Sequence, residues 1–273
     1  MNKVQEKVFG LFKIFVEICD KLQLKWYLIN GSALGAIKYK GFIPWDDDLD
    51  VGMPREDYEV FLEKAQDMLP ENIFLQNYKT DKKFPQIYSK LRNSNTAFIE
   101  NGAKHLDINH GIFMDVFPLD GYTENGKSFN SLRKKILSWK IACAFNDQSS
   151  MKIRVRNKFF RMLGCHRRTQ RYLENNERSI RSSWDGKQQV CNHGDRMHNK
   201  GVLPKEYYGD GRIVSFEGID AVVPYMTEEY LSHKYGDWKS ELPVEEQRSH
   251  HIAVVCDTET SYRKYIDFFV EKQ

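Results

Sequence analysis

Residues 29–51 read INGSALGAIKYKGFIPWDDDLDV and contain a glycine-serine turn followed by two aspartates one residue apart. The apolar residues 26–29 predict a buried strand that runs into the turn. Residues 33–40 have the composition of a short helix, which Gly41 would end. Residues 48–51 alternate polar and apolar side chains and predict a second strand. The order strand, tight turn, helix, strand is the unit around which we expect the fold to form.

Helix and strand patterns continue on both sides of this unit. Residues 3–23 place apolar side chains at helical spacing, and residues 55–68 predict a helix after Pro54. Short strands are predicted at 73–78, 86–92, 96–100 and 112–117, and a hairpin at 212–216 and 219–223. A last helix is expected from Thr227, with the threonine as its cap. The predicted class is α+β with a mixed sheet.

From about residue 128 the apolar spacing becomes helical, through 132–145, 153–163 and 171–181. We therefore expect a core at residues 1–125 and a helical, basic insertion or subdomain at 126–205. Residues 206–273 would add the hairpin and C-terminal helices that pack back on the core.

Composition excludes several classes of protein. The chain has 273 residues, and 41 Lys and Arg against 38 Asp and Glu give a net charge of +3, so nucleic-acid binding is not expected. The N-terminal sequence lacks the apolar run and cleavage site of a signal peptide, and no stretch is apolar enough to cross a bilayer. Five widely spaced cysteines match neither a disulfide framework nor a zinc site. We expect a cytoplasmic protein, or one on the inner face of the plasma membrane.

Three carboxylates carry the chemistry that we predict. Asp48 and Asp50 would share one face of a strand, because side chains two residues apart on a strand point the same way. Asp115 interrupts an apolar strand, where an unpaired charge would be costly. Hard oxygen ligands of this kind suit Mg²⁺ or Mn²⁺, and three acids can hold the two ions used in displacement at phosphorus. A solvated acidic loop is the alternative for 46–50, but its apolar neighbours disfavour it.

The Gly31-Ser32 turn would offer backbone N–H groups and a hydroxyl to a phosphate at the start of a helix. Alone, such a turn is more often a helix cap. Basic side chains near the proposed site in sequence could neutralise phosphates or be solvated, and they are Lys38, Lys40, Arg55, Lys90 and Arg92, with Lys90 and Arg92 preferred. Trp45 could stack on a base or enclose an ammonium group, although packing is the commoner role. His250 and His251 are interpreted as a surface helix end without a base role.

The run from Ile29 to Val51 resembles the signature of the LicD family, which includes the fukutin-related proteins. Blocks of the same resemblance are Lys90-Leu91-Arg92-Asn93, Gly111-Ile112-Phe113-Met114-Asp115-Val116-Phe117-Pro118-Leu119-Asp120 and Tyr235-Gly236-Asp237. The resemblance covers residues 5–122 and 210–245. It implies a fold similar to DNA polymerase β-type nucleotidyltransferases, with residues 1–125 as the catalytic core. Ser32 and Lys38 stand where the family commonly has Thr and Arg.

The resemblance also implies a reaction. LicD-like proteins transfer a phosphorylated alcohol, often phosphocholine from CDP-choline, to a sugar hydroxyl of a surface glycan such as lipopolysaccharide, teichoic acid or capsule. A CDP-alcohol and a glycan, which can be lipid-linked, are therefore the expected partners. One alternative is a nucleotidyltransferase that adds NMP to a small molecule, RNA or protein. Another is a non-catalytic, membrane-docked glycan-binding protein.

Residues 152–171, KIRVRNKFFRMLGCHRRTQR, contain eight Lys or Arg and no acid, with apolar side chains between them. A basic, apolar helix of this kind can lie on anionic lipid. A helix packed on the core with a solvated basic face explains the pattern equally well. Peripheral contact with an anionic membrane is thus one of two expectations for this segment.

Overall fold

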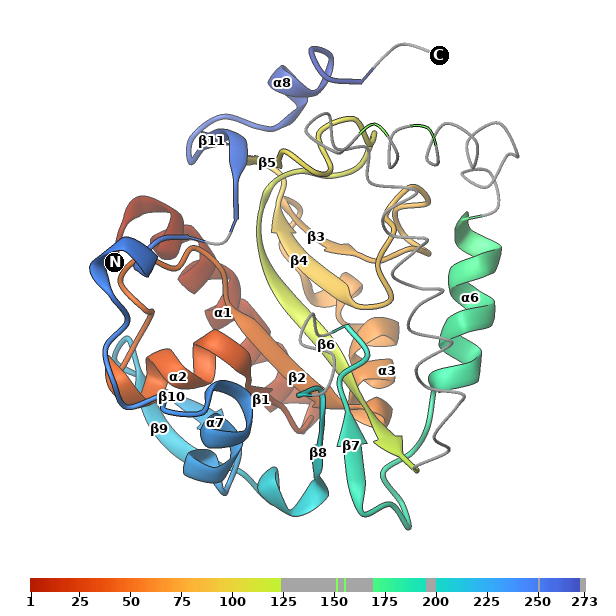
Figure 1. The fold of residues 1–273 in the computed structure, drawn as a ribbon. Coiled ribbons are helices and arrows are strands. Elements are labelled where there is room, and N and C mark those ends of the chain that lie inside the picture. Colours follow the sequence, from red (N-terminus) through yellow and green to blue (C-terminus); the bar gives the residue numbers. More distant parts are fainter. Residues whose placement is uncertain (124–150, 152–154, 156–168, 195–199, 250, 271–273) are drawn as a thin grey trace.

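The computed structural model describes residues 1–123, 151, 155, 169–194, 200–249 and 251–270 (Figure 1). The helices predicted at 132–145 and 153–163 lie outside these residues, and so does most of the basic segment 152–171. The helix predicted at 171–181 is present as α6, Thr169–Ile180.

The N-terminal helix α1, Lys3–Leu22, forms because its sequence supplies both a cap and an apolar stripe. The Asn2 side chain accepts the N–H groups of Val4 and Gln5, and the Gln5 side chain accepts the N–H of Asn2, which is a capping box. The helix ends at Gln23, whose backbone is left-handed at φ 55°. The buried stripe of α1 packs on the central sheet.

A seven-stranded mixed sheet forms the centre of the described structure (Figure 1). Its strands are β1 Tyr27–Leu28, β2 Asp50–Pro54, β3 Ile73–Gln76, β4 Ser89–Asn93, β6 Ile112–Tyr122, β7 Gln189–Cys191 and β8 Val202–Pro204. The order is β1-β2-β6-β4-β3, with β7 on β6 and β8 on β7, and the β2–β6 pair is parallel. The long strand β6 pairs with β2, β4 and β7 and therefore lies at the centre of the sheet. The mixed α and β architecture predicted from the sequence is confirmed.

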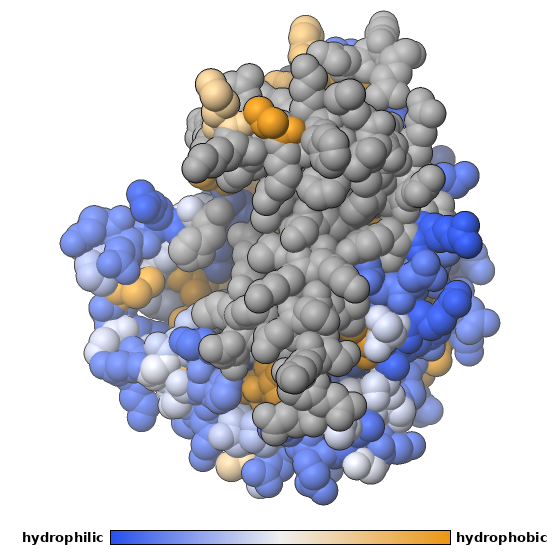
Figure 2. Space-filling model, turned by 45° about the vertical axis from the view of Figure 1, so that its right-hand side comes forward, coloured by the Kyte–Doolittle hydropathy of each residue, from blue (hydrophilic) through white to orange (hydrophobic). Residues whose placement is uncertain are grey.

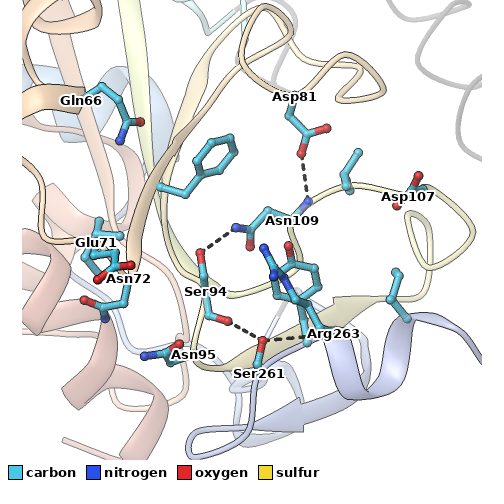
Figure 3. Close-up of a pocket in the computed structure, with 15 residues that line it drawn as sticks. Gln66, Glu71, Asn72, Asp81, Ser94, Asn95, Asp107, Asn109, Ser261 and Arg263 are labelled. Atoms are coloured by element: carbon cyan, nitrogen blue, oxygen red, sulfur yellow. Dashed lines mark hydrogen bonds between the residues drawn. The ribbon is translucent and has the colours of Figure 1, made fainter.

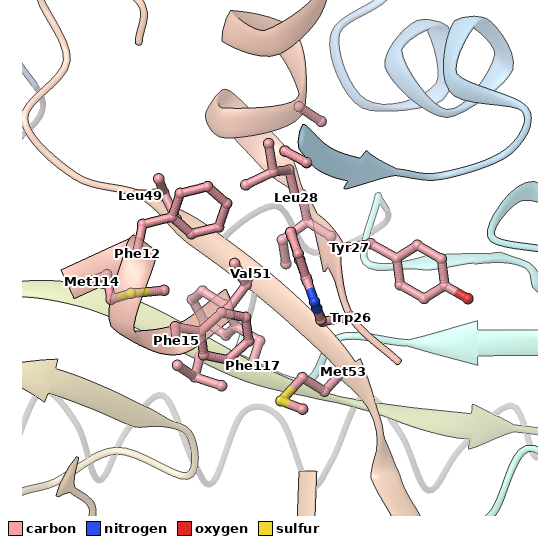
Figure 4. Close-up of a cluster of buried hydrophobic side chains, with 14 of the residues drawn as sticks. Phe12, Phe15, Trp26, Tyr27, Leu28, Leu49, Val51, Met53, Met114 and Phe117 are labelled. Atoms are coloured by element: carbon pink, nitrogen blue, oxygen red, sulfur yellow. The ribbon is translucent and has the colours of Figure 1, made fainter. Parts of the chain in front are cut away.

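One face of this sheet is the hydrophobic core. Phe12 and Phe15 of α1 lie against Val51 and Met53 of β2 and Met114 of β6, and all five side chains are buried (Figure 4). Because side chains alternate along a strand, Asp50 and Asp115 point to the opposite face. The core thus fixes the face on which the acidic side chains lie.

The remaining elements surround the sheet. They are α2 Asn30–Lys38, α3 Arg55–Lys64, η1 Gln66–Met68, η3 Lys205–Tyr207, α7 Thr227–Tyr235, η4 Val244–Glu246 and α8 Arg263–Ile266, with the strand pairs β9 Arg212–Phe216 with β10 Ile219–Val223 and β5 Ala97–Glu100 with β11 Ala253–Asp257. The predicted hairpin 212–223 is confirmed to the residue.

Four local predictions need correction. The helix after the glycine-serine turn begins at Asn30 rather than Ala33, and the following strand begins at Asp50, so Asp48 precedes it. Residues 189–204 lie in the stretch expected to be helical but contribute β7 and β8 to the sheet. Thr227 does not cap α7, because its hydroxyl donates to the Pro224 carbonyl instead.

On the face drawn in Figure 2 the coloured residues are mainly hydrophilic, and the hydrophobic residues form small groups. In the part of the chain that the structure describes, no helix has both the length and the apolar composition needed to cross a membrane.

Candidate active site

A row of polar side chains crosses four strands on the face away from α1. Asp50 pairs with Asp115, Asp115 with Lys90, and Lys90 with Gln76. Paired residues on neighbouring strands point to the same face, so these four side chains form one line across β2, β6, β4 and β3. The register of the sheet therefore brings together Asp50 and Asp115, which are far apart in sequence.

Lys90 neutralises part of this row directly. Its ammonium lies 2.6 Å from Asp115 Oδ1 and 3.3 Å from the centre of the Phe113 ring. Its side chain is 5% exposed, and a charge so deeply buried requires a partner such as Asp115. The structure thus places Lys90 among the carboxylates and already paired with one of them, and its predicted contact with a phosphate stays a prediction.

Arg92 lies on β4 two residues after Lys90, where it is buried, and its contacts stabilise the fold. It donates through Nη1 to the Gly111 carbonyl at 2.7 Å and through Nε to Gln76, and its guanidinium lies over Phe113. Burial lowers the pKa of Arg92, although Glu100 and Asp115 raise it. Its donors are therefore directed at the protein itself.

Asp48 lies in the loop before β2 and is held by a histidine from the far end of the chain. His251 Nε2 lies 2.7 Å from Asp48 Oδ2, and His251 Nδ1 lies 3.1 Å from Glu100 Oε1. Burial lowers the pKa of His251, but hydrogen bonds to Asp48 and Glu100 outweigh it and raise the pKa to about 11. Burial raises the pKa of Asp48, but the hydrogen bond and charge of His251 bring it below its usual value. The interpretation of His251 as a surface helix end is wrong.

The other acids of the loop are also close to Asp48. Burial, then the charges of Asp48 and Asp47, raise the pKa of Asp46 to about 8, and Asp46 shares a hydrogen bond with Asp48. Asp47 Oδ2 accepts the Ser249 hydroxyl at 2.7 Å. The loop backbone is fixed to α1, because Gln5 Nε2 donates to the Asp46 carbonyl at 2.8 Å. This loop is therefore an ordered part of the site.

The glycine-serine turn lies against the same acids. The Asp50 N–H donates to Ser32 Oγ at 2.8 Å, and Asn30 Nδ2 donates to Asp50 Oδ2 at 3.0 Å. A Cβ added to Gly31 would lie 3.0 Å from Asp46 Oδ2. The turn thus faces the carboxylates as predicted, and a phosphate bound here would meet the Asp46 carboxylate unless that charge were neutralised.

Two other predicted residues make their described contacts with residues other than these acids. The Lys38 ammonium is 3.0 Å from Glu241 Oε1 and donates to the Lys239 and Ser240 carbonyls, so its contacts are with the segment after α7. Trp45 is half-buried, with its ring edge-on to Tyr39 at 6.2 Å.

Arg55 is likewise engaged elsewhere. Its guanidinium binds Asp120 and Glu177, so it does not serve the phosphate turn that its position in the sequence made possible.

Negative charge is in excess at this site. The carboxyl groups are Asp46, Asp47, Asp48, Asp50, Asp115 and Glu100, and the cationic groups near them are Lys90, Arg92 and His251. Burial, then the charges of Asp48 and Asp115, raise the pKa of Asp50 well above its ordinary value. A cation bound at Asp50 would relieve this repulsion.

The chemistry of the donor set fits a divalent cation, because carboxylate oxygens are the ligands that Mg²⁺ and Mn²⁺ prefer. Within the described ranges, however, no three His, Cys, Asp or Glu side chains are assembled into a metal-binding cluster. Cation binding would therefore require the carboxylates to lie closer to a common ion than they do in the described structure.

A polar cavity of about 1060 Å³ lies apart from these acids, at the end of β3 and β4 that is nearest α8 (Figure 3). Asp81, Ser94 and Asn109 line it and are joined by hydrogen bonds, and Arg263 closes one side. None of the predicted site residues lines it. The size of a cavity does not identify its chemistry, so the carboxylates stay the candidate site.

Sequence reasoning missed Asn30, Glu100 and His251 and treated Asp46 only as part of the loop. Asn30 and Asp46 belong to the quoted run 29–51, so the pattern that gave Ser32 and Asp48 could have included them. Glu100 and His251 carry no such signal, because they reach Asp48 through the pairing of β5 and β11.

The turn and the three predicted carboxylates lie in a part of the chain that a family model matches. Residues 23–135 match the model described as LicD/FKTN/FKRP, nucleotidyltransferase domain. The resemblance to the LicD family is thereby confirmed. The matched range includes the turn and all three predicted carboxylates but not His251.

The chain is also similar to individual proteins. It is 26% identical over 269 residues to the lipopolysaccharide cholinephosphotransferase LicD of Haemophilus influenzae, covering 92% of this chain and 96% of that protein. An uncharacterized protein of Rickettsia prowazekii is 39% identical over 64 residues, which is 23% of each chain. An uncharacterized protein of Rickettsia typhi is 31% identical over 101 residues, or 37% of this chain and 27% of that protein.

Proposed function

We propose that the chain is a LicD-type phosphotransferase that moves a phospho-alcohol from a cytidine diphosphate donor to a sugar hydroxyl of a cell-surface glycan. The observation that carries this proposal is the convergence of Asp48, Asp50 and Asp115 opposite the Gly31-Ser32 turn. Similarity along almost the whole of a lipopolysaccharide cholinephosphotransferase supports it. Phosphocholine from CDP-choline is the donor that we propose first, on a nucleotidyltransferase scaffold of the DNA polymerase β type.

We propose Mg²⁺, or Mn²⁺, as the cofactor, held by Asp48, Asp50 and Asp115. Bound ions of this kind neutralise a diphosphate and stabilise the oxygens that attack and leave. The raised pKa of Asp50 supports the proposal, because it means that the groups around Asp50 compensate the charge of this carboxylate poorly.

The residues of the chain then have separate tasks. The Gly31-Ser32 turn would bind and orient the donor diphosphate, and Trp45 would stack on the base or the choline group. The acceptor hydroxyl gives its proton to the Asp115 carboxylate while the acceptor oxygen forms a bond to the donor phosphorus that carries the alcohol. The bond from that phosphorus to the CMP oxygen breaks, and CMP leaves with the electron pair. Lys90 beside Asp115 would hold that carboxylate in place.

The experiment that tests this function is incubation of the protein with Mg²⁺, a panel of CDP-alcohols and glycan acceptors, followed by chromatography of the nucleotide products. Release of CMP supports the proposal. Release of pyrophosphate from CTP or another NTP would support a nucleotidyltransferase instead. No metal-dependent product with any nucleotide would support a binding protein.

Ser32→Ala is expected to lower kcat/KM for the CDP-alcohol about 10- to 100-fold. The hydroxyl accepts the backbone N–H of Asp50 and would itself donate to the donor diphosphate, and a lost hydrogen bond to a charged group costs about 1.5–3 kcal/mol. The measurement is CMP release against donor concentration. Lys40→Ala is the control, because Lys40 accepts the Glu217 N–H through its backbone carbonyl, which the change to Ala keeps. Equal effects of the two changes would reduce Ser32 to a local packing residue.

Contact of residues 152–171 with an anionic membrane remains a proposal, and it suits a lipid-linked acceptor. The described residues do not bear on it.

A further inference from the structure

The His251 side chain is fixed more tightly than a surface residue needs to be. Both ring nitrogens meet carboxylates, Asp48 at 2.7 Å and Glu100 at 3.1 Å. The ring also lies edge-on to Phe113 and Phe98, with centroid distances of 5.6 Å and 6.4 Å. Only 10% of its side chain is exposed. Contacts on both nitrogens and on the ring restrict it to one orientation.

Asp48, in contrast, has no regular structure to hold it. Residues 42–49 form neither helix nor strand, and β2 begins only at Asp50. Side chains elsewhere must therefore determine where the Asp48 carboxylate points. His251 supplies that contact from the segment just before β11. The partner strand of β11 is β5, which carries Glu100 and Phe98, and Phe98 packs on Phe113 of β6. The chain Glu100–His251–Asp48 thus connects the loop to the centre of the sheet.

We propose that His251 is a positioning residue, which, oriented by Glu100, aims the Asp48 carboxylate at the cation-binding site. A carboxylate that fixes a histidine, which in turn orients a neighbouring group, is an arrangement that tunes metal sites in general. The proposal rests on the proposed function, since it presumes that Asp48 is a cation ligand. It adds a residue outside the matched family range and 203 positions away from Asp48 in sequence.

The test compares four proteins: wild type, His251→Ala, His251→Gln and Val254→Thr. Val254 lies on β11, three residues after His251, with its side chain exposed, so Val254→Thr controls for a change in the same segment of the chain. Circular dichroism and the urea midpoint first establish that each variant is folded. Hydrogen–deuterium exchange of residues 42–50 and titration with Mn²⁺, both without nucleotide, are then measured.

His251→Ala is expected to increase exchange in residues 42–50 and to weaken Mn²⁺ binding about 10- to 100-fold, which is the usual effect of removing such a supporting group. In turnover assays kcat should fall more than the KM of the donor rises. His251→Gln should recover part of the loss, because its amide N–H lies near the position of Nε2 and can donate to Asp48. Val254→Thr should match wild type.

Equal Mn²⁺ affinity in wild type and His251→Ala, including no binding by either, would overturn the inference. If His251→Ala does not fold, Glu100→Met decides instead, because it leaves the histidine in place without its orienting acceptor and should weaken Mn²⁺ binding several-fold. The proposed function fails by a different result, namely no CMP from any CDP-alcohol with wild-type protein that binds Mn²⁺.

Discussion

Asp50→Asn is expected to lower the rate of CMP release at least about 1000-fold, and Asp48→Asn and Asp115→Asn should do the same. Each change removes the charge of a proposed cation ligand and keeps the volume of the side chain. Loss of roughly 4 kcal/mol of transition-state stabilisation corresponds to this factor. The measurement is kcat with saturating CDP-alcohol and Mg²⁺. Asp20→Asn, an exposed acid on α1, is the control and should turn over like wild type.

Asp50→Asn is also expected to change the stability of the fold. Because the pKa of Asp50 is raised well above 3.8, the folded protein retains a proton that the unfolded chain releases as pH rises. Without metal, Asp50 therefore destabilises the fold increasingly as pH rises from about 4 towards the folded pKa. Asp50→Asn should be at least as stable as wild type in urea at pH 7, with the difference vanishing near pH 3.

Near-normal turnover in any two of the three Asn variants would contradict the carboxylate assignment.

Much of this site follows from local sequence patterns. The turn at Gly31-Ser32 and the strands at Asp50 and Asp115 are each visible within a window of ten residues, because apolar periodicity and glycine placement act locally. Their convergence was predicted from the need to compensate a buried charge at Asp115. The parallel register of β2 and β6 supplies the contact that the sequence could only imply.

What the sequence did not reveal depends on long-range packing. His251 reaches Asp48 only because β11 pairs with β5, and nothing near residue 251 distinguishes it from a surface histidine. Lys38 has the charge for phosphate binding, yet the chain after α7 provides Glu241 as its partner. Strands β7 and β8 were missed because three-residue strands are too short to show alternation.

A buried ion-pair network at the far end of β6 shows the same dependence on long-range packing and leads to the second large effect. Arg55 binds both oxygens of Asp120 at 2.7 Å and Glu177 of α6 at 2.9 Å. The side chains of Arg55 and Asp120 are 3% and 0% exposed. Tyr78 also donates to Glu177, so the network joins α3, β6 and α6.

Arg55→Met is expected to lower the free energy of unfolding by about 3–5 kcal/mol, because it leaves the Asp120 charge buried without its partner. The measurement is urea unfolding, with Lys25→Met as the control. The Lys25–Asp210 pair is 59% and 94% exposed and should contribute at most about 1 kcal/mol. Adding Asp120→Leu to Arg55→Met should recover part of the loss, although the Ser182 N–H then loses its acceptor. A loss below about 1 kcal/mol in Arg55→Met would mean that water reaches Asp120 and that the network does not hold α6 to the sheet.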